Sequence, residues 1–136
     1  MVKLFKLEIL TPDRGFFEGE VESLVVNTPT GEMGILCNTL PMVASLTAGI
    51  MRIKQRGKWM EAAGGEGFIE IKPDGVMILV HSANWPHEIN EDALKREIDQ
   101  MSVILKKQQS LHEYKLAKAQ LARQFAKLKL KDRGMD

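Results

Sequence analysis

The chain is poor in cysteine, in aromatic residues and in long hydrophobic runs. Its 136 residues include one cysteine, Cys37, which excludes a disulfide within the chain and is typical of a reducing compartment. No apolar stretch approaches the roughly 18–20 residues that a transmembrane helix requires. Residues 1–8 interrupt their apolar side chains with lysines and a glutamate, unlike a signal peptide. We therefore expect a cytoplasmic protein.

Residues that perform catalysis or bind metals are not arranged in useful patterns. The histidines His81, His87 and His112 have no metal-ligand spacing to one another or to Cys37. The glycine-rich segment 64–67 superficially resembles a phosphate-binding loop, but no Lys-Ser/Thr pair follows it. We interpret this segment as a hairpin turn. The sequence indicates neither a catalytic site nor a metal site, and the sparse aromatic residues are not interleaved with basic ones, which argues against nucleic acid as a partner.

Residues 1–85 have the pattern of β structure. Apolar and polar residues alternate in segments 5–9 and 69–72, as expected of half-buried strands. Residues 76–80 are continuously apolar, which predicts a strand covered on both faces. Because turn signals rich in Pro, Asp and Gly separate these runs at even spacing, we predict an antiparallel β-sandwich or flattened barrel of about eight to ten strands.

After Trp85-Pro86 the period changes to that of two helices. Asn90 is a favourable N-cap for the first helix, and Ser110 with Glu113 forms a capping box for the second. The connection is short, so the helices are expected to form an antiparallel hairpin. Each helix has a narrow apolar stripe. The first comprises Leu94, Ile98, Met101 and Leu105, and the second comprises Tyr114, Ala117, Leu121, Phe125 and Leu128.

The net charge of +1 conceals an asymmetry between the two parts. Residues 1–86 carry eight basic and ten acidic residues, whereas residues 87–136 carry eleven and eight, so the net charges are −2 and +3. The basic residues concentrate late in the second part. Such a segment suits an acidic protein surface, a membrane surface or nucleic acid, or else it is a solvated helix face.

Several ordered motifs resemble the epsilon subunit of the bacterial F-type ATP synthase over essentially the whole chain. Each motif is a modest signal, but their order and spacing, followed by a helical hairpin, are specific. They are TPDRGFFEGEV at 11–21, GEMGIL at 31–36 with Asn38 and Pro41, GIMRI at 49–53, GGEGF at 64–68, and Ala83 followed by Trp85-Pro86.

The resemblance implies a non-catalytic subunit of the central stalk, that is, of the rotor of a proton-translocating ATP synthase. Residues 1–86 would form the β-sandwich that binds the gamma subunit and rests on the ring of c subunits. The contact with the c ring would use Glu32, with Gly31 and Met33 beside it. The glycines Gly31 and Gly34 suit a tight turn that projects Glu32 into solvent.

Residues 87–136 would form the family's regulatory hairpin, which either folds against the sandwich or extends along gamma and inhibits ATP hydrolysis. In the inhibited state its basic residues would face acidic segments of the catalytic alpha and beta subunits. The candidate basic residues are Lys115, Lys118, Arg123, Lys127 and Lys129.

Some bacterial members of this family bind ATP through an Ile-Asp-x-x-Arg-Ala motif and later arginines, and this chain departs from that pattern. Asn90 follows Ile89 in place of the acid, and Ala93 replaces the arginine. Of the later pair, Arg123 matches and Lys127 replaces the other, without an arginine's bidentate contact to phosphate. We therefore expect no cofactor and weak or absent ATP binding.

Two other classes of function were weighed against this assignment. A stand-alone nucleotide-sensing module would need measurable nucleotide affinity, which the loss of arginine at Ala93 opposes. An enzyme built on a β-sandwich would need clustered acid and base groups that the sequence does not display. The expected location is the cytoplasmic face of the bacterial plasma membrane, where the chain is held only through the complex.

Overall fold

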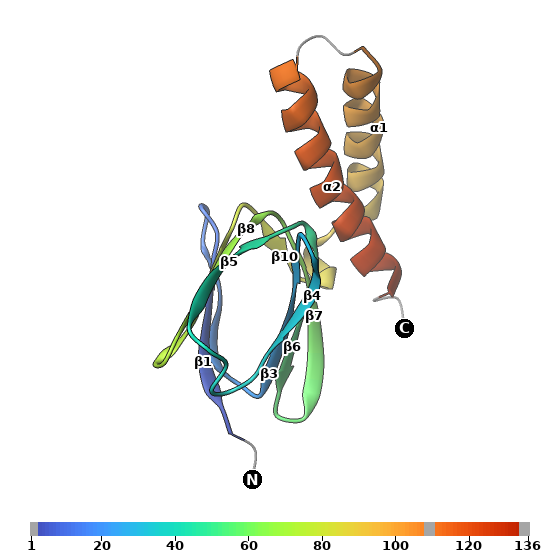
Figure 1. Ribbon diagram of the computed structural model, residues 1–136. Helices are drawn as coiled ribbons and strands as arrows, with labels where there is room; N and C mark the ends of the chain where they lie inside the picture. The colour runs from blue at the N-terminus through green and yellow to red at the C-terminus, as the bar shows by residue number, and fades with distance from the viewer. Residues whose placement is uncertain (1–2, 108–110, 134–136) are drawn as a thin grey trace.

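The computed structural model describes residues 3–107 and 111–133. Strands occupy the first part of this chain and helices the second (Figure 1). The elements are β1 (Phe5–Leu10), β2 (Gly15–Val21), β3 (Ser23–Thr28), β4 (Gly31–Ile35), β5 (Met42–Leu46), β6 (Gly49–Gln55), β7 (Lys58–Gly64), β8 (Gly67–Lys72), β9 (Gly75–Val80), β10 (Ala83–Asn84), the 3-10 turn η1 (Pro86–Glu88), α1 (Glu91–Lys107) and α2 (Leu111–Arg133).

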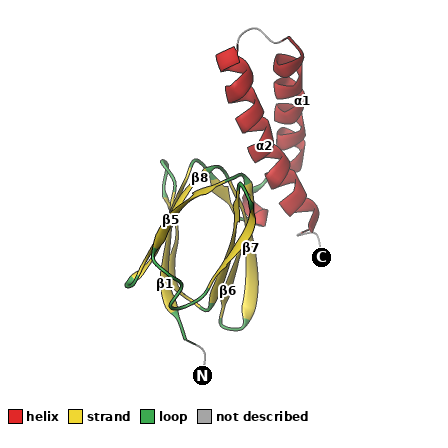
Figure 2. Ribbon diagram, in the orientation of Figure 1, coloured by secondary structure: helices red, strands yellow, loops and turns green. Residues whose placement is uncertain are grey.

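The ten strands form two five-stranded sheets that face each other, which confirms the predicted sandwich. The first sheet has the order β2-β1-β9-β8-β5, and the second has the order β10-β7-β6-β3-β4. Nearly all neighbours are antiparallel, but β1 and β9 pair in parallel, with Leu7 opposite Val76. The two helices lie beyond one end of the sandwich, on the side of β6 and β7 (Figure 2).

The core lies between the two sheets and consists of the inward-facing residues of the alternating strands. Leu7 and Ile9 of β1, Leu24 of β3, Ile53 of β6 and Ile78 of β9 are all fully buried. This alternation follows from strand geometry, because successive side chains point to opposite faces of a sheet. Apolar burial of this extent is the dominant stabilising contribution to a domain of this size.

The glycine-rich segment is not the hairpin turn that the sequence suggested. It joins β7 of the second sheet to β8 of the first, and Gly67 pairs with Val80 of β9. A Cβ on Gly67 would lie 2.7 Å from the Cα of Val80, and one on Gly65 would lie 3.0 Å from the Cδ of Arg123. The glycines therefore allow a neighbouring strand and helix α2 to approach closely.

Helix α1 begins as the sequence predicts, whereas α2 buries a partly different set of residues. The backbone N–H of Ala93 donates to the Asn90 side chain at 3.1 Å, which confirms the N-cap of α1. Phe125 was placed on the apolar stripe of α2, but its side chain is 50% exposed. Gln124 and Leu130 are buried instead, so the stripe assigned to α2 is rotated relative to the helix face that packs.

Two parts of the sequence prediction lie outside the residues described. They are the capping box that begins at Ser110, and the side chains of Leu105, Glu113 and Tyr114. Among the described residues, no helix has the length and apolar character that a membrane-spanning segment needs.

Candidate interaction surfaces

The outer face of the first sheet carries a group of apolar side chains around Glu70. Cross-strand pairing places Val43 of β5 opposite Glu70, and Glu70 opposite Met77 of β9. On the same face, Phe68 of β8 lies opposite Leu79 of β9. We call Val43, Phe68, Met77 and Leu79 the apolar sheet face. Val43 is 68% exposed and Phe68 is 41% exposed, so this surface is accessible to a partner.

The apolar sheet face corrects one expectation from the sequence. Residues 76–80 were predicted to be covered on both faces, but only the inward-facing residues are buried, while Met77 and Leu79 are half-buried. Next to this face, β5 is an edge strand of its sheet, and the preceding loop carries Leu40 with 75% of its surface exposed. Edge strands and exposed apolar side chains are ordinarily protected in monomers, so their combination favours an interface.

Glu32 projects from a strand and not from the tip of a turn. It is the second residue of β4, the edge strand of the second sheet, and its side chain is 61% exposed. Gly31 has φ of 128°, which suits the turn that precedes β4, but Gly34 lies within the strand. Met33 packs against the core, so it does not share the exposed surface of Glu32. The expected tight turn flanked by both glycines was therefore wrong in its position.

An ion pair orients the Glu32 carboxylate across the sheet. The Nη2 of Arg52 lies 3.5 Å from Oε2 of Glu32. The same guanidinium lies over the ring of Trp59, with 5.7 Å between its Cζ and the ring centroid. All three side chains are substantially exposed, so the pair contributes little to stability. It does hold Glu32 near one end of a groove beneath α2.

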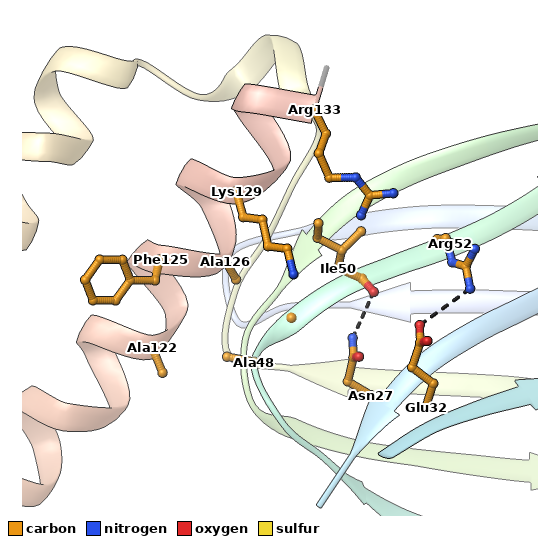
Figure 3. Close-up of a pocket in the computed structure, with 11 residues that line it drawn as sticks. Asn27, Glu32, Ala48, Ile50, Arg52, Ala122, Phe125, Ala126, Lys129 and Arg133 are labelled. Carbon is orange, nitrogen blue, oxygen red and sulfur yellow. Dashed lines mark hydrogen bonds and ion pairs between the residues drawn. The ribbon is translucent and has the colours of Figure 1, made fainter. Parts of the chain in front are cut away.

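The groove beneath α2 has a volume of about 540 Å³ and separates the helix from the second sheet. In Figure 3, Lys129 and Arg133 extend from α2 toward the strands, whereas Phe125 points away from them. The floor is held in place by Asn27, whose side-chain amide donates to the carbonyl of Ile50 at 2.8 Å. The groove thus brings cations of the hairpin near the carboxylate of Glu32.

A small apolar cluster joins the hairpin to the sandwich. Leu130 of α2 is 1% exposed and packs with residues of α1 and of strands β6 and β7. We call these residues the docking cluster, and they are Ile50, Ala63, Ile89, Leu94, Ile98 and Leu130. Leu121 and Leu128 pack against its periphery.

Two ion pairs cross the same boundary. The Nη1 of Arg123 lies 3.2 Å from Oε1 of Glu66, and the Nη2 of Arg133 lies 2.7 Å from Oε2 of Glu61. We call these contacts the docking ion pairs. The ammonium of Lys131 also donates to the carbonyl of Pro86 at 3.3 Å. The hairpin therefore meets the sandwich through both apolar and charged contacts.

The structure divides the five basic residues assigned to an inhibitory face. Lys115, Lys118 and Lys129 are exposed, and Lys129 lines the groove beneath α2. Arg123 has only 13% of its side chain exposed, since it faces Glu66, and Lys127 is half-buried between α2 and the start of α1. Burial lowers the pKa of Lys127, opposed by the nearby carboxylate of Glu97. In this conformation the five residues do not form one surface.

A small cavity lies where the nucleotide motif of the family resemblance would be. Its volume is about 160 Å³, and its walls include Ile89, Asn90, Ala93 and Lys127, four of the five residues assigned to weak nucleotide binding. Arg123, the fifth, is not part of the wall. The side-chain oxygen of Asn90 accepts the N–H of Ala93, so it serves the helix cap. The structure thus brings four of the residues together and separates the arginine.

One charged contact at the junction was not anticipated from the sequence. The Nη1 of Arg14 lies 2.7 Å from Oε2 of Glu88, and Oε1 of Glu88 accepts the N–H of Trp85 at 2.8 Å. The hydrogen bond from Arg14 lowers the pKa of Glu88. Trp85 also stacks on Phe16 with 4.5 Å between ring centroids. Arg14, Phe16 and Trp85 all belong to the quoted motifs, so the signal was present, but spacing alone could not pair residues about 70 positions apart.

The structure defines a class of protein, a β-sandwich with a docked helical hairpin, and comparisons with known proteins identify its family. Residues 4–86 match the family model described as "ATP synthase, Delta/Epsilon chain, beta-sandwich domain". The ATP synthase epsilon chain of Ruminiclostridium cellulolyticum is 42% identical over 129 residues, covering 95% of this chain and 96% of that relative. The epsilon chain of Caldanaerobacter subterraneus subsp. tengcongensis is 40% identical over 131 residues, covering 96% and 95%.

The fold is also found among solved structures. A chain of the mitochondrial ATP synthase of Euglena gracilis superimposes with a TM-score of 0.74 at 17% identity, covering 98% of this chain and 82% of that one. A central-stalk chain of the Tetrahymena thermophila mitochondrial ATP synthase gives a TM-score of 0.60 at 11% identity, covering 95% and 97%. The chain belongs to the ATP synthase delta/epsilon family, whose bacterial relatives are epsilon chains of ATP synthase.

Proposed function

We propose that the sandwich, residues 1–86, couples the rotor by binding the gamma subunit through the apolar sheet face. The observation that carries this proposal is the exposure of Val43 and Phe68 on a sheet whose outer side bears no helix (Figure 2). Burying such side chains against a partner removes apolar surface from water, which is the main favourable contribution to association. The adjoining edge strand β5 and Leu40 extend the surface.

The exposed carboxylate of Glu32 is the proposed contact with the ring of c subunits. Glu32 is exposed on the edge strand β4, on the opposite sheet from the apolar sheet face, so both partners can bind at once. Arg52 offers a second charge beside it, and a polar loop with both donors and acceptors would complement this pair. Gly31 is exposed beside Glu32 at the start of β4 and belongs to the same proposed contact, whereas Met33 packs against the core.

The hairpin, residues 87–136, is the proposed inhibitory element of ATP hydrolysis. In the docked form Lys115, Lys118 and Lys129 are exposed, whereas Arg123 and Lys127 face inward. Undocking would free those two cations and present all five to acidic segments of the alpha and beta subunits. Binding to such segments moves the equilibrium only as far as the partner prefers the undocked form. The complex holds the chain peripherally at the cytoplasmic face of the membrane.

The gamma assignment is tested by replacing one residue of the apolar sheet face. Val43→Lys places a charge opposite Glu70, where it can pair within the sheet, so the fold is expected to survive. We expect binding to purified gamma, measured by biolayer interferometry, to weaken more than about tenfold. The matched control is Leu116→Lys, a 58% exposed position on α2, with unchanged binding. Equal binding by Val43→Lys and the unmodified chain would contradict the assignment.

A further inference from the structure

The cavity at the start of α1 has the wrong chemistry for a triphosphate. Phosphate oxygens need several donors, yet the cavity wall contains two carboxylates, Glu88 and Glu97, and one cation, Lys127. Two further oxygens in the wall, Oε1 of Gln124 and Oδ1 of Asn84, are buried without a hydrogen-bond partner. Gln124 is only 6% exposed, and its amide group donates to Glu97. Acceptors thus dominate the lining.

The arginine that would assist a nucleotide is engaged elsewhere. Arg123 lies against Gly65 and pairs with Glu66 in the β7–β8 connection, outside the cavity wall. To reach the cavity it would have to leave a contact in which its side chain is largely buried. Leaving a partly buried guanidinium without its carboxylate costs free energy, so Arg123 is expected to stay paired with Glu66.

The second docking ion pair anchors the far end of α2. Arg133 reaches Oε2 of Glu61 on β7, and this oxygen is buried with no hydrogen bond of good geometry. The positive charge of Arg133 is therefore the main interaction that offsets the burial of this oxygen. Together, the two docking ion pairs join α2 to the sandwich at positions 10 residues apart, on both sides of the apolar contact made by Leu130.

The opposite net charges of the sandwich and the hairpin also favour docking. Residues 1–86 carry a net charge of −2 and residues 87–136 a net charge of +3, so they attract each other when docked. Attraction of this kind is screened by salt, because the Debye length falls from about 10 Å at 0.1 M to about 3 Å at 1 M. The docking cluster of six residues is too small to make these charges irrelevant.

We propose that the docking ion pairs take the place of a bound nucleotide in holding the hairpin of this chain against its sandwich, so that ionic strength and competing acidic surfaces, and not ATP, govern its release. This inference rests on the proposed inhibitory role only in what hairpin release would do to ATP hydrolysis. The docking equilibrium itself belongs to the free chain. An acidic partner surface would compete for Arg123 and Arg133 in the way that salt does.

The test measures the distance between sandwich and hairpin in the full chain. Nitroxide labels are placed on Lys58→Cys and Lys118→Cys, two exposed positions outside the docking ion pairs, with Cys37→Ser removing the native thiol. Pulsed electron resonance then gives the ratio of undocked to docked molecules. We expect this ratio to rise severalfold between about 0.1 M and about 1 M KCl, and to stay constant when millimolar MgATP is added.

Variants separate the docking ion pairs from general charge effects. The double variant Glu61→Gln with Glu66→Gln is expected to raise the ratio about tenfold at low salt and to make it insensitive to KCl. Glu70→Gln is the control, since Glu70 pairs with Lys72 on the outer face of the first sheet and its loss changes the net charge without touching α2. Glu70→Gln is expected to change the ratio much less than the double variant does.

Three results would overturn the proposal. They are a shift toward the docked form caused by MgATP, a ratio independent of salt in the unmodified chain, and equal opening by Glu70→Gln and by the double variant. None of these results depends on gamma or on ATP hydrolysis. A hairpin that behaves as expected but fails to inhibit the assembled enzyme would instead count against the proposed function.

Discussion

The sandwich buries a continuous core between two sheets, whereas the hairpin meets the sandwich through a small apolar cluster and a set of charged contacts. In the sandwich, residues from both sheets, such as Leu24 and Ile78, are fully shielded from water. At the junction, Leu130 is buried, but Arg123, Arg133 and Lys131 supply much of the remaining contact. One region therefore depends on apolar burial and the other partly on charge.

This difference indicates that the hairpin can separate while the sandwich stays folded. Local opening has a free energy set by the contacts that it breaks, and these are few at the junction. For the proposed rotor role such a division is useful, because the sandwich stays bound to its neighbours while the hairpin changes position. The following substitutions test the comparison, beginning with the largest effect.

Gly67→Ala is expected to disrupt the sandwich most severely. The added Cβ would meet the backbone of Leu79 and Val80, which cannot move without breaking the β8–β9 pairing. We predict a loss of more than about 3 kcal/mol in the free energy of unfolding, measured by urea denaturation. Gly34→Ala is the control, because nothing lies within 4 Å of its added Cβ. Similar stabilities for the two variants would show that Gly67 does not serve close strand approach.

Truncating a buried side chain to alanine should have different effects in the sandwich and at the junction. Ile78→Ala removes part of the sandwich core and should lower the free energy of unfolding by about 2–4 kcal/mol. Leu130→Ala should leave the urea transition of the sandwich in place, yet weaken docking enough to expose α2 to protease. Far-UV circular dichroism during denaturation and limited proteolysis distinguish the two. A lowered sandwich transition in Leu130→Ala would mean that the regions unfold as one.

Acid should weaken the junction at Glu88. Arg14 lowers the pKa of Glu88 in the folded chain, so this contact stabilises fully above the ordinary glutamate pKa of about 4.3 and is lost as pH falls through the lower folded value. Glu88→Gln should cost less than about 1 kcal/mol at pH 7, and this cost should shrink as the pH is lowered below the ordinary glutamate pKa. Thermal unfolding across this range checks it, with Glu18→Gln as the control. A cost that does not change as the pH is lowered would contradict the ionic origin.

Lys127→Met should give the smallest effect, in the opposite direction. Burial lowers the pKa of Lys127, so its charged form disfavours docking at pH 7, and this penalty fades as pH rises toward the ordinary lysine value. The variant should lower the ratio of undocked to docked molecules about threefold, measured by pulsed electron resonance on the labelled chain. Lys129→Met, at an exposed position, should change little. Weaker docking in Lys127→Met would indicate that Lys127 attracts Glu97 more than burial penalises it.

Local patterns in the sequence were sufficient for the elements and their order. Alternating apolar residues predicted the strands, and Asn90 predicted the start of α1, because both signals depend on neighbours within a few positions. The ten strands and the two helices fell on the expected sides of Trp85-Pro86. The motif series was specific enough to identify the family that the comparisons confirmed.

Contacts between distant residues could not be read from local patterns. The parallel pairing of β1 with β9 and the crossover at 64–67 depend on which strands meet, and periodicity does not specify that. Phe125 was placed inside because its type favours burial, but Gln124 is buried through its bond to Glu97 on the facing helix. The same limit applies to Arg123, whose partner Glu66 lies 57 positions earlier.

Hydrogen exchange of the full chain, followed by mass spectrometry, tests the central claim most directly. The account predicts that amides of α1 and α2 exchange through an opening that leaves β6 and β9 protected, and that raising KCl from about 0.1 M to about 1 M speeds only the helices. A single free energy of opening shared by helices and strands, unaffected by salt, would contradict it.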